Sequence, residues 1–446
     1  MTEQKNTQTA GMAFMGMIFF LFGFVTTFNI TLADKFKSVF ELSNFQAQLV
    51  NGAFFFTYFV LSFAVGGLIK KIGYKFGVIL GLILVALGSF LFFPAAKAIS
   101  FPFFLVAIFI MASGVVFLQV AANPYVTALG PSETASGRLN LTQALNSIAT
   151  YIAPLIASVF VFGTASAALS AEQAAKDVPA PFLIIGIIVL IIAVAIWLLK
   201  LPEIPTQGVE RKSVWKYPHV VLGAIGIFFY VGAEVGSAAM LQRYFQEALP
   251  VPMVPAKAAM MIALYWGGAM VGRFYGSFML SNVEKSKKYL YTVLVVLLAL
   301  FVGWFVRREI TDGLIFAAIA IVNYLAMQLG KGHAGRSLAV FGIIAAVLLF
   351  VVMFAHGNFI LWLGLSIGFF NSIMFPNIFA LGVDGLDKGE LSMASGLINS
   401  LIVGGAVIPV LMGVVADHVG VRFAFILPII CYLYIVFYAL VGSKHK

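Results

Sequence analysis

The chain has 446 residues, of which 62% are hydrophobic and only 10% are charged, and its mean hydropathy is +1.05. A soluble domain is about 45–50% apolar, so this composition excludes one and indicates an all-α polytopic membrane protein. The net charge of +10 does not indicate a nucleic-acid partner, because the basic residues gather in alternate loops, as the positive-inside rule requires. The single cysteine and the five histidines have no metal-site spacing, so we expect no metal and no cofactor.

Apolar stretches of about 20 residues, each long enough to cross a hydrocarbon core of about 30 Å, recur along the whole sequence. The polar opening MTEQKNTQTA lacks the cleavage site of a signal peptide and is expected to stay on the first helix. The predicted crossings lie at about 12–33, 46–69, 76–95, 102–129, 137–163, 181–200, 219–247, 255–280, 288–306, 313–330, 338–355, 358–383, 392–415 and 422–442.

The first crossing carries two polar residues near its outer end, Asn29 and Asp34, and an aromatic residue, Phe22. Asn29 is a candidate ligand for a substrate, and Phe22 could offer an apolar face to it. Asp34 is a candidate for cation coupling. The alternative for Asp34 is a solvated surface acid, because lysines flank it, and for Phe22 it is packing against lipid or core.

The fourth and fifth crossings each present paired amides on one helix face. Gln119 and Asn123 are spaced i, i+4, and Gln143 and Asn146 are spaced i, i+3. Amides both donate and accept hydrogen bonds, so we expect a cavity that binds a hydroxyl-rich ligand. The alternative is glue between helices, worth about 0.6–2 kcal/mol for each bond. Pro124, directly after Asn123, should break or bend the helix, and membranes tolerate this where the freed carbonyl finds a partner.

The polar stretch LPEIPTQGVERKSVWKYPH (201–219) is the longest charged linker and divides the chain. We therefore predict an N-terminal half at 1–200, a cytoplasmic linker at 201–218 and a C-terminal half at 219–446.

Glu234 lies near the middle of the first crossing after the linker. A carboxylate there costs several kcal/mol, so an acid inside the membrane is a functional candidate by default, and we expect Glu234 to take part in cation coupling. The alternative is a structural ion pair that locks two helices, with Arg273 of the next crossing as the partner. That crossing also holds Tyr265, an aromatic candidate for the binding site, for which core packing is the alternative.

The two halves share a repeated motif. PYVTALGPSETASG (124–137) and PNIFALGVDGLDKG (376–389) both contain ALG followed seven residues later by Gly. The offset of 252 between them places Asn371 opposite Gln119 and Pro376 opposite Pro124. Transporters are often built from such repeats, and we expect Asn371 to be a further substrate ligand and Pro376 a further break.

The same offset predicts an insertion. The first helices of the halves begin only about 205 residues apart, so about 45 extra residues must lie between 280 and 358. That length suits one helical hairpin, which we place at about 288–330. The plan is thus two pseudo-symmetric six-helix halves plus an extra helical hairpin.

Basic loops set the predicted orientation. KKIGYK (70–75), KSKK (285–288) and KGHAGR (331–336) fall on the side of both termini, which we place in the cytoplasm, with the helices in the plasma (inner) membrane. RR (307–308) falls on the other side, against the rule.

GGLIKKIGYK (66–75) resembles the loop signature G-x-x-x-D-R-x-G-R-K of the major facilitator superfamily. The corresponding residues are Gly66, Gly73 and Lys75, with Lys71 keeping the charge of the first Arg. Together with AANPYVTALGP (121–131), RLNLTQALNS (138–147) and NSIMFPNIFALG (371–382), this loop makes the chain resemble the fucose–galactose–glucose:proton symporter family. The resemblance implies the major facilitator fold and sugar transport by alternating access, with Gln143 and Asn146 at positions that line the sugar cavity.

Two departures from that family concern its acids. The fucose-transporting members carry an Asp after the first-helix Asn and a Glu after the Leu of the fourth helix, where this chain has Ile30 and Gln119. The resemblance therefore supports sugar transport strongly and proton coupling poorly.

The sequence predicts a secondary transporter for a neutral hexose or deoxyhexose, with a proton or sodium ion as the coupling cation. The alternatives are an uncoupled sugar uniporter, an exporter of another small molecule, and a transporter-like sensor. An enzyme is not expected, since the crossings contain no Ser–His pair, metal cluster or carboxylate dyad. The partners we expect are the sugar and the lipid bilayer, with the protein acting as a monomer.

Overall fold

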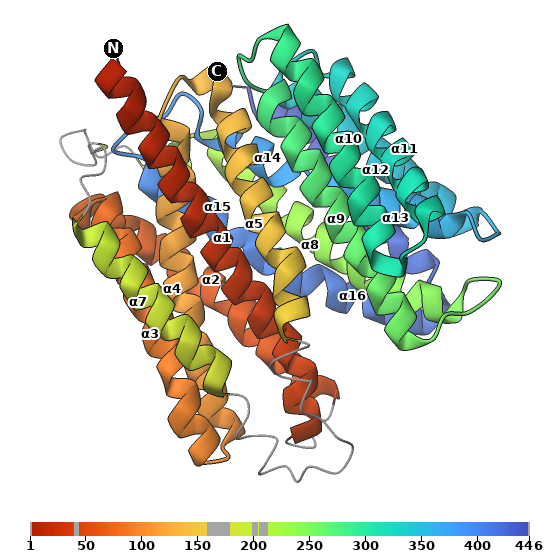
Figure 1. The fold of residues 1–446 in the computed structure, drawn as a ribbon, viewed down its shortest axis with the longest axis horizontal. Coiled ribbons are helices and arrows are strands. Elements are labelled where there is room, and N and C mark those ends of the chain that lie inside the picture. The colour runs from red at the N-terminus through yellow and green to blue at the C-terminus, as the bar shows by residue number, and fades with distance from the viewer. Residues whose placement is uncertain (1, 40–43, 158–178, 199–203, 205–212, 445–446) are drawn as a thin grey trace. The chain divides into compact units, whose positions relative to one another are not determined.

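The computed structural model describes residues 2–39, 44–157, 179–198, 204 and 213–444, and within these residues it contains helices and no strand (Figure 1). The helices before the linker are α1 (Thr2–Val39), α2 (Asn44–Ile72), α3 (Tyr74–Lys97), α4 (Phe101–Ala128), α5 (Ala135–Ala157) and α7 (Pro179–Leu198). Those after it are α8 (Pro218–Glu247), α9 (Pro255–Met279), α10 (Lys285–Arg307), α11 (Ile310–Leu329), α12 (Ala334–Phe354), α13 (Ile360–Asn371), α14 (Met374–Val383), α15 (Leu391–Ser400), α16 (Gly404–Val419) and α17 (Ile426–Phe437).

Each predicted crossing overlaps, over the described residues, with one helix or with a run of consecutive helical segments. Twelve of the described segments are long and apolar enough to span a membrane. The twelve do not include α5 and α9, which have 23 and 25 residues. Both helices are long enough but more polar, because α5 carries the amides of the predicted site and α9 carries Arg273. The chain is therefore a multi-pass integral membrane protein.

The structure divides into two compact units. The first consists of Met1–Tyr125, Ile148–Lys212 and Leu386–Ser400, and the second of Val126–Ser147, Ser213–Gly385 and Leu401–Lys446. Each unit thus combines segments from both predicted halves, since α15 belongs to the first unit and the beginning of α5 to the second. The boundary at 201–218 follows from the charged linker in the sequence and stays a prediction.

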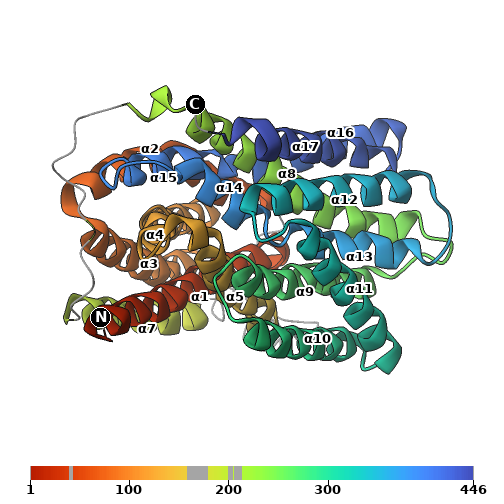
Figure 2. The same ribbon diagram turned by 90° about the horizontal axis from the view of Figure 1, so that it is seen from above.

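In the first unit, α3 lies along α7, and α15 lies along α2 (Figures 1 and 2). Glycines allow the second approach. A Cβ atom at Gly66 would lie 2.5 Å from the carbonyl oxygen of Ser392, and one at Gly396 would lie 2.6 Å from the carbonyl oxygen of Ser62. The first glycine of the predicted loop signature is therefore a packing requirement of the α2–α15 contact.

In the second unit, α8 packs against α14, α16 and α17, while α12 packs against α17 and α13. Helices α10 and α11 form a hairpin that lies along α9 (Figure 2). The last helix, α17, packs against α12, as α7 packs against α3 in the first unit. Once α10 and α11 are set aside, the third and sixth helices of each predicted half pair in the same way. This packing is consistent with an extra hairpin, whose place as an insertion stays a prediction.

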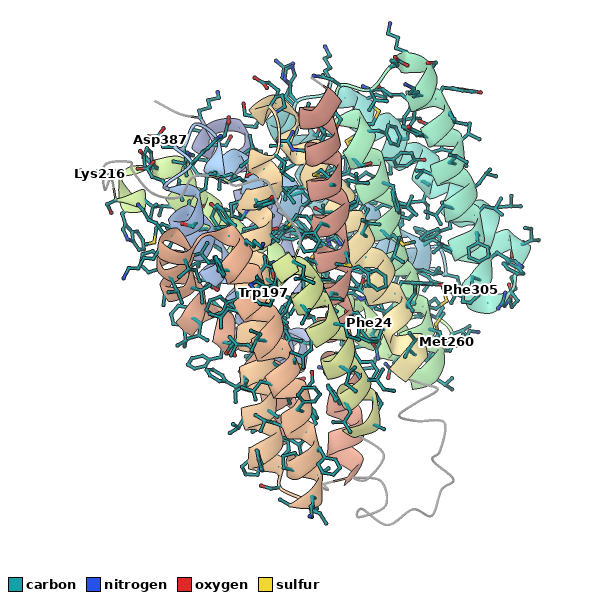
Figure 3. All side chains as sticks on the ribbon, turned by 60° about the vertical axis from the view of Figure 1, so that its left-hand side comes forward. Phe24, Trp197, Lys216, Met260, Phe305 and Asp387 are labelled. Carbon is teal, nitrogen blue, oxygen red and sulfur yellow. The ribbon has the colours of Figure 1, made fainter. Side chains whose placement is uncertain are left out.

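The turn of this hairpin accounts for the two arginines that oppose the charge rule. Arg307 forms a two-pronged ion pair with Asp312, whose side chain is buried. Arg308 has a left-handed backbone (φ 59°) and lies 4.3 Å from the ring centroid of Phe305, which is marked in Figure 3. A cation over an aromatic face is attracted to its negative quadrupole. Both charges thus have local partners in the hairpin turn.

Large apolar side chains remain exposed along the outer helices, among them Trp197 of α7, which is 63% exposed (Figure 3). An apolar surface of this extent is suited to contact with lipid tails, and Trp is enriched where a membrane meets water.

Candidate functional site

Glu234 lies in the middle of α8, and its side chain is buried. Its Oε1 atom is 3.6 Å from Nη2 of Arg273 on α9, which is the partner that the sequence suggested. Two buried charges at this separation compensate each other, and removing one of them would leave the other without a counter-charge. Glu234 and Arg273 therefore have to be considered as one buried ion pair.

Arg273 has two further partners. Its Nε donates a hydrogen bond to the carbonyl oxygen of Ser372 (3.1 Å), and its Nη1 donates to Oγ of Ser147 on α5 (2.5 Å). One guanidinium group thus joins α8, α9, the beginning of α5 and the segment between α13 and α14, and the residues it contacts all lie in the second unit.

Pro376 explains why the carbonyl of Ser372 is free to accept a hydrogen bond from Arg273. Pro376 has no N–H, so the carbonyl of Ser372, four residues earlier, loses its bond within the helix. The helix is interrupted at this point, with α13 ending at Asn371 and α14 beginning at Met374. The freed carbonyl is the one that accepts from Arg273. The predicted break at Pro376, and a partner for the freed group, are both present.

Pro124 acts differently in the first unit. Helix α4 continues through it from Phe101 to Ala128, so no break occurs. The carbonyl four residues before it belongs to Val120, and it accepts a hydrogen bond from Oγ of Ser395 on α15 (2.9 Å). A single hydroxyl satisfies the freed carbonyl without interrupting the helix, which membrane helices commonly allow.

Tyrosines hold the two amides that the repeat places opposite each other. The hydroxyl of Tyr58 on α2 donates to Oε1 of Gln119 (2.8 Å). Nδ2 of Asn371 donates to the hydroxyl of Tyr265 on α9 (2.5 Å), and the hydroxyl of Tyr432 donates to Oδ1 of Asn371 (2.7 Å). Both amide groups of Asn371 thus have protein partners, whereas the hydrogen bond from Tyr58 engages only the oxygen of Gln119.

Tyr265 also connects this amide to the ion pair, because its hydroxyl donates to the backbone carbonyl of Glu234 (2.9 Å). The ring is fully buried. Tyr265 therefore acts as part of the framework that holds α8, α9 and α13 together, which is the packing alternative stated for it.

Asn123 lies one turn after Gln119 and has no exposed surface. Neither its Oδ1 nor its Nδ2 has a hydrogen-bond partner. A buried amide left unsatisfied costs about 1–3 kcal/mol for each group, so it calls for a ligand or a water molecule. Asn123 and Gln119 share a face of α4 and form the candidate ligand-binding pair of the first unit.

On α5, the side chains of Gln143 and Asn146 are buried in the second unit, and Asn146 directly precedes the Ser147 that binds Arg273. Asn140, one turn earlier, donates to the side-chain oxygen of Asn377 on α14 (3.3 Å). The Asn140 amide therefore links two helices by a hydrogen bond, which is the structural alternative stated for the amides.

The other predicted residues have separate places. Phe22 is buried and packs against Phe19, with ring centroids 4.9 Å apart, so packing describes it. The side chains of Asn29 and Asp34 lie outside the described residues.

In the signature loop, Gly73 separates α2 from α3 with a φ of 82°, a left-handed conformation that favours glycine. Lys71 is exposed, and Nζ of Lys75 donates to the carbonyl of Trp197 at the end of α7 (2.9 Å). A cation at the end of a helix is stabilised by the free carbonyls there.

Sequence reasoning missed three hydroxyl groups, that of Ser395 in the first unit and those of Ser147 and Tyr432 in the second. The prolines did signal that the carbonyls four residues earlier need partners. No local pattern identifies the donors that satisfy these carbonyls, Ser395 for Val120 and Arg273 for Ser372, because both donors come from distant parts of the chain. Within the described residues, no group of three or more His, Cys, Asp or Glu side chains is arranged to hold a metal ion.

Comparison with known proteins agrees with this architecture. The model of the Major Facilitator Superfamily matches residues 12–327. A glucose/galactose transporter of Brucella abortus is 39% identical over 451 residues, which cover 99% of this chain and 97% of the relative. An L-fucose-proton symporter of Escherichia coli is 31% identical over 470 residues, covering 99% and 95% of the two chains. A crystal structure of the E. coli fucose:proton symporter has a TM-score of 0.78 at 27% identity and covers 98% of this chain and 100% of that one. The chain therefore belongs to the Major Facilitator Superfamily.

Proposed function

We propose that this protein is a secondary transporter that moves a neutral hexose or deoxyhexose across the membrane by alternating access, in symport with a cation. The observation that carries the sugar assignment is the α4 pair: Asn123 is fully buried with both amide atoms unpartnered, beside a Gln119 fixed by Tyr58. The similar proteins named as glucose/galactose transporters and fucose symporters support the same substrate class.

The chemistry of this pair suits a sugar. Tyr58 occupies the oxygen of Gln119 and leaves its NH₂ group as a donor, while Asn123 offers both a donor and an acceptor. A sugar hydroxyl needs one of each, and no fixed charge has to be neutralised. Asn29, Gln143 and Asn146 stay predicted ligands, and Asn371 is the weakest candidate because both of its groups are already bonded.

We propose that the carboxylate of Glu234 binds the coupling cation. Of the acidic side chains that the structure describes inside the apolar spans, those of Glu234 and Asp312 are buried. Arg307 forms an ion pair with Asp312. Glu234 is held less tightly, at 3.6 Å from Arg273, and Oε1 has no hydrogen-bond partner. A proton bound there would neutralise the carboxylate and weaken its attraction to Arg273. Sodium is the competing ion, and Asp34 stays a predicted second acid.

Uptake into proteoliposomes tests both parts. The purified protein is reconstituted, and entry of radiolabelled glucose, galactose and fucose is measured under separate proton and sodium gradients, with counterflow as the gradient-free mode. Accumulation under one gradient identifies the coupling ion, and Glu234→Gln should then abolish accumulation while keeping counterflow. Equilibration without accumulation would make the protein a uniporter. If no sugar enters in any mode, sugar transport is refuted, and the exporter and sensor alternatives take its place.

We further propose that the protein acts as a monomer in the plasma (inner) membrane, with both termini in the cytoplasm and 201–218 joining the halves 1–200 and 219–446. Lysines in the 285–288 and 331–336 segments support this orientation. In a Cys431→Ser background, cysteines at Glu309 and His333, both exposed, should react with an impermeant thiol reagent from opposite sides of the membrane. Labelling from one side would contradict the orientation and the hairpin crossing.

A further inference from the structure

The predicted inserted hairpin, α10 and α11, makes a polar contact with the end of α13, next to the break between α13 and α14. Nδ2 of Asn323, on α11, donates a hydrogen bond to the carbonyl oxygen of Phe369 on α13 (3.0 Å). The same oxygen accepts from Oγ of Ser372 (2.6 Å), so two donors hold one carbonyl. Asn323 is fully buried. A hairpin that needed only to pack against apolar neighbours would not require an amide at this depth, where polar groups are costly.

The last turn of α13 is enclosed on both sides. From the hairpin, the ring of Phe316 packs against the ring of Phe369, with centroids 4.6 Å apart. From α9, Gly272 lets the break approach closely, since a Cβ atom there would lie 2.6 Å from Cβ of Ser372 and 2.9 Å from the carbonyl oxygen of Phe369. The hairpin and α9 therefore hold the end of α13 between them.

The held segment leads directly to the ion pair. Three residues after Phe369, the carbonyl that Pro376 frees belongs to Ser372, and it accepts from Nε of Arg273. Nη2 of the same guanidinium lies 3.6 Å from Oε1 of Glu234. A displacement of the end of α13 would carry this carbonyl away from Arg273, and the guanidinium would lose one of the contacts that fix it beside the carboxylate.

We propose that the inserted hairpin is a brace for the broken helix and that Asn323 is a positioning residue for cation coupling. By holding the last turn of α13, Asn323 keeps the Ser372 carbonyl aimed at Arg273, and Arg273 therefore stays beside Glu234. The proposal rests on the coupling role proposed for Glu234, and it assigns the hairpin a task in coupling and none in sugar binding.

The groups that face Glu234 come from three helices. Tyr230 lies one turn before it on α8, Arg273 and Tyr265 come from α9, and Tyr432 comes from α17. Helix α14 contains no charged residue, and the charged Asp417 and the ionisable His418 of α16 lie at its exposed end. Arg273 is thus the cation whose position controls the environment of Glu234, and a brace that acts on Arg273 acts on coupling.

Asn323→Leu tests the brace, because leucine keeps the volume of the side chain and removes the donor. Val295→Ala is the matched control, since Val295 is a buried residue of α10, the hairpin helix that packs against α9 and α11. Asn323→Gln should restore the donor in part. We expect Asn323→Leu to lower gradient-driven accumulation about fivefold or more, with an unchanged half-saturation concentration for counterflow. Val295→Ala should change neither, and Asn323→Gln should recover part of the accumulation.

If Asn323→Leu and Val295→Ala lose the same amount of accumulation, and counterflow falls with it in both variants, the brace is refuted and the hairpin is purely structural. If the wild-type protein shows no counterflow, the proposed function fails, and a second measurement decides on the brace. The thermal unfolding of Asn323→Leu combined with Arg273→Met should then shift by less than the sum of the two single shifts, whereas Val295→Ala combined with Arg273→Met should be additive. An additive Asn323 result would refute the brace independently of transport.

Discussion

The buried ion pair of Glu234 and Arg273 gives the sharpest prediction about stability. Arg273→Met removes the positive charge and leaves the carboxylate buried without a counter-charge. Glu234→Gln leaves a buried guanidinium, but one that still donates to Ser372 and Ser147. The double variant has no charge to compensate, so the two substitutions should not be additive.

The magnitudes follow from these contacts. Removing one partner of a buried pair costs about 3–5 kcal/mol. Arg273→Met also leaves the carbonyl freed by Pro376 unsatisfied, which adds about 1–3 kcal/mol, for a total of about 4–8 kcal/mol. Glu234→Gln should cost about 3 kcal/mol, the lower end of the range, because the remaining bonds hold the guanidinium in place. The double variant should lose only about 1–3 kcal/mol, since the carbonyl alone stays unsatisfied.

Unfolding in mixed detergent micelles, followed by tryptophan fluorescence, measures these free energies. Arg243→Met is the matched control, because Arg243 lies 2.9 Å from both Glu247 and Asp417 but all three side chains are exposed, that of Arg243 to 39%. An exposed pair contributes about 0–1 kcal/mol, so this variant should unfold almost like the wild type. If the double variant loses the sum of the two single losses, the ion pair contributes no interaction energy, and the argument from burial is wrong.

Three further predictions concern the site and its packing. Tyr58→Phe removes the donor that orients Gln119, so sugar affinity in counterflow should fall about fivefold, from the loss of about 1 kcal/mol; an unchanged affinity would make Gln119 a packing residue. Gly272→Ala should destabilise the protein by about 1–3 kcal/mol in thermal unfolding, because the added methyl group has no space. Gly413→Ala is the control: a Cβ atom there would have nothing within 4 Å, so this variant should be neutral or slightly stabilised. Pro376→Ala restores an N–H that competes with Arg273 for the carbonyl of Ser372. Sugar uptake should therefore slow, while the unfolding temperature should not fall. An uptake rate equal to that of the wild type would contradict a role for the helix break in transport.

The sequence by itself determined which segments are helical and that they cross a membrane, and its repeat predicts an extra hairpin at about 288–330. These properties depend on the length of apolar runs and on the spacing of a repeat, which are local or arithmetic features of the chain. It also made Glu234 and the amides of α4 and α5 candidates for the site, because a polar group in an apolar run stands out without any knowledge of its neighbours. Even the partner Arg273 could be suggested, since adjacent helices in the chain commonly pack together.

Only the tertiary structure decided which of these polar groups are already satisfied. Tyr432 bonds Asn371 across 61 residues, and Ser395 bonds the carbonyl of Val120 across 275. Hydrogen bonds between distant segments depend on how helices pack, which no local pattern contains. For this reason the sequence placed Asn123 and Asn371 in one class, while the structure separates them: one amide has no partner, and the other is held at both ends by tyrosines.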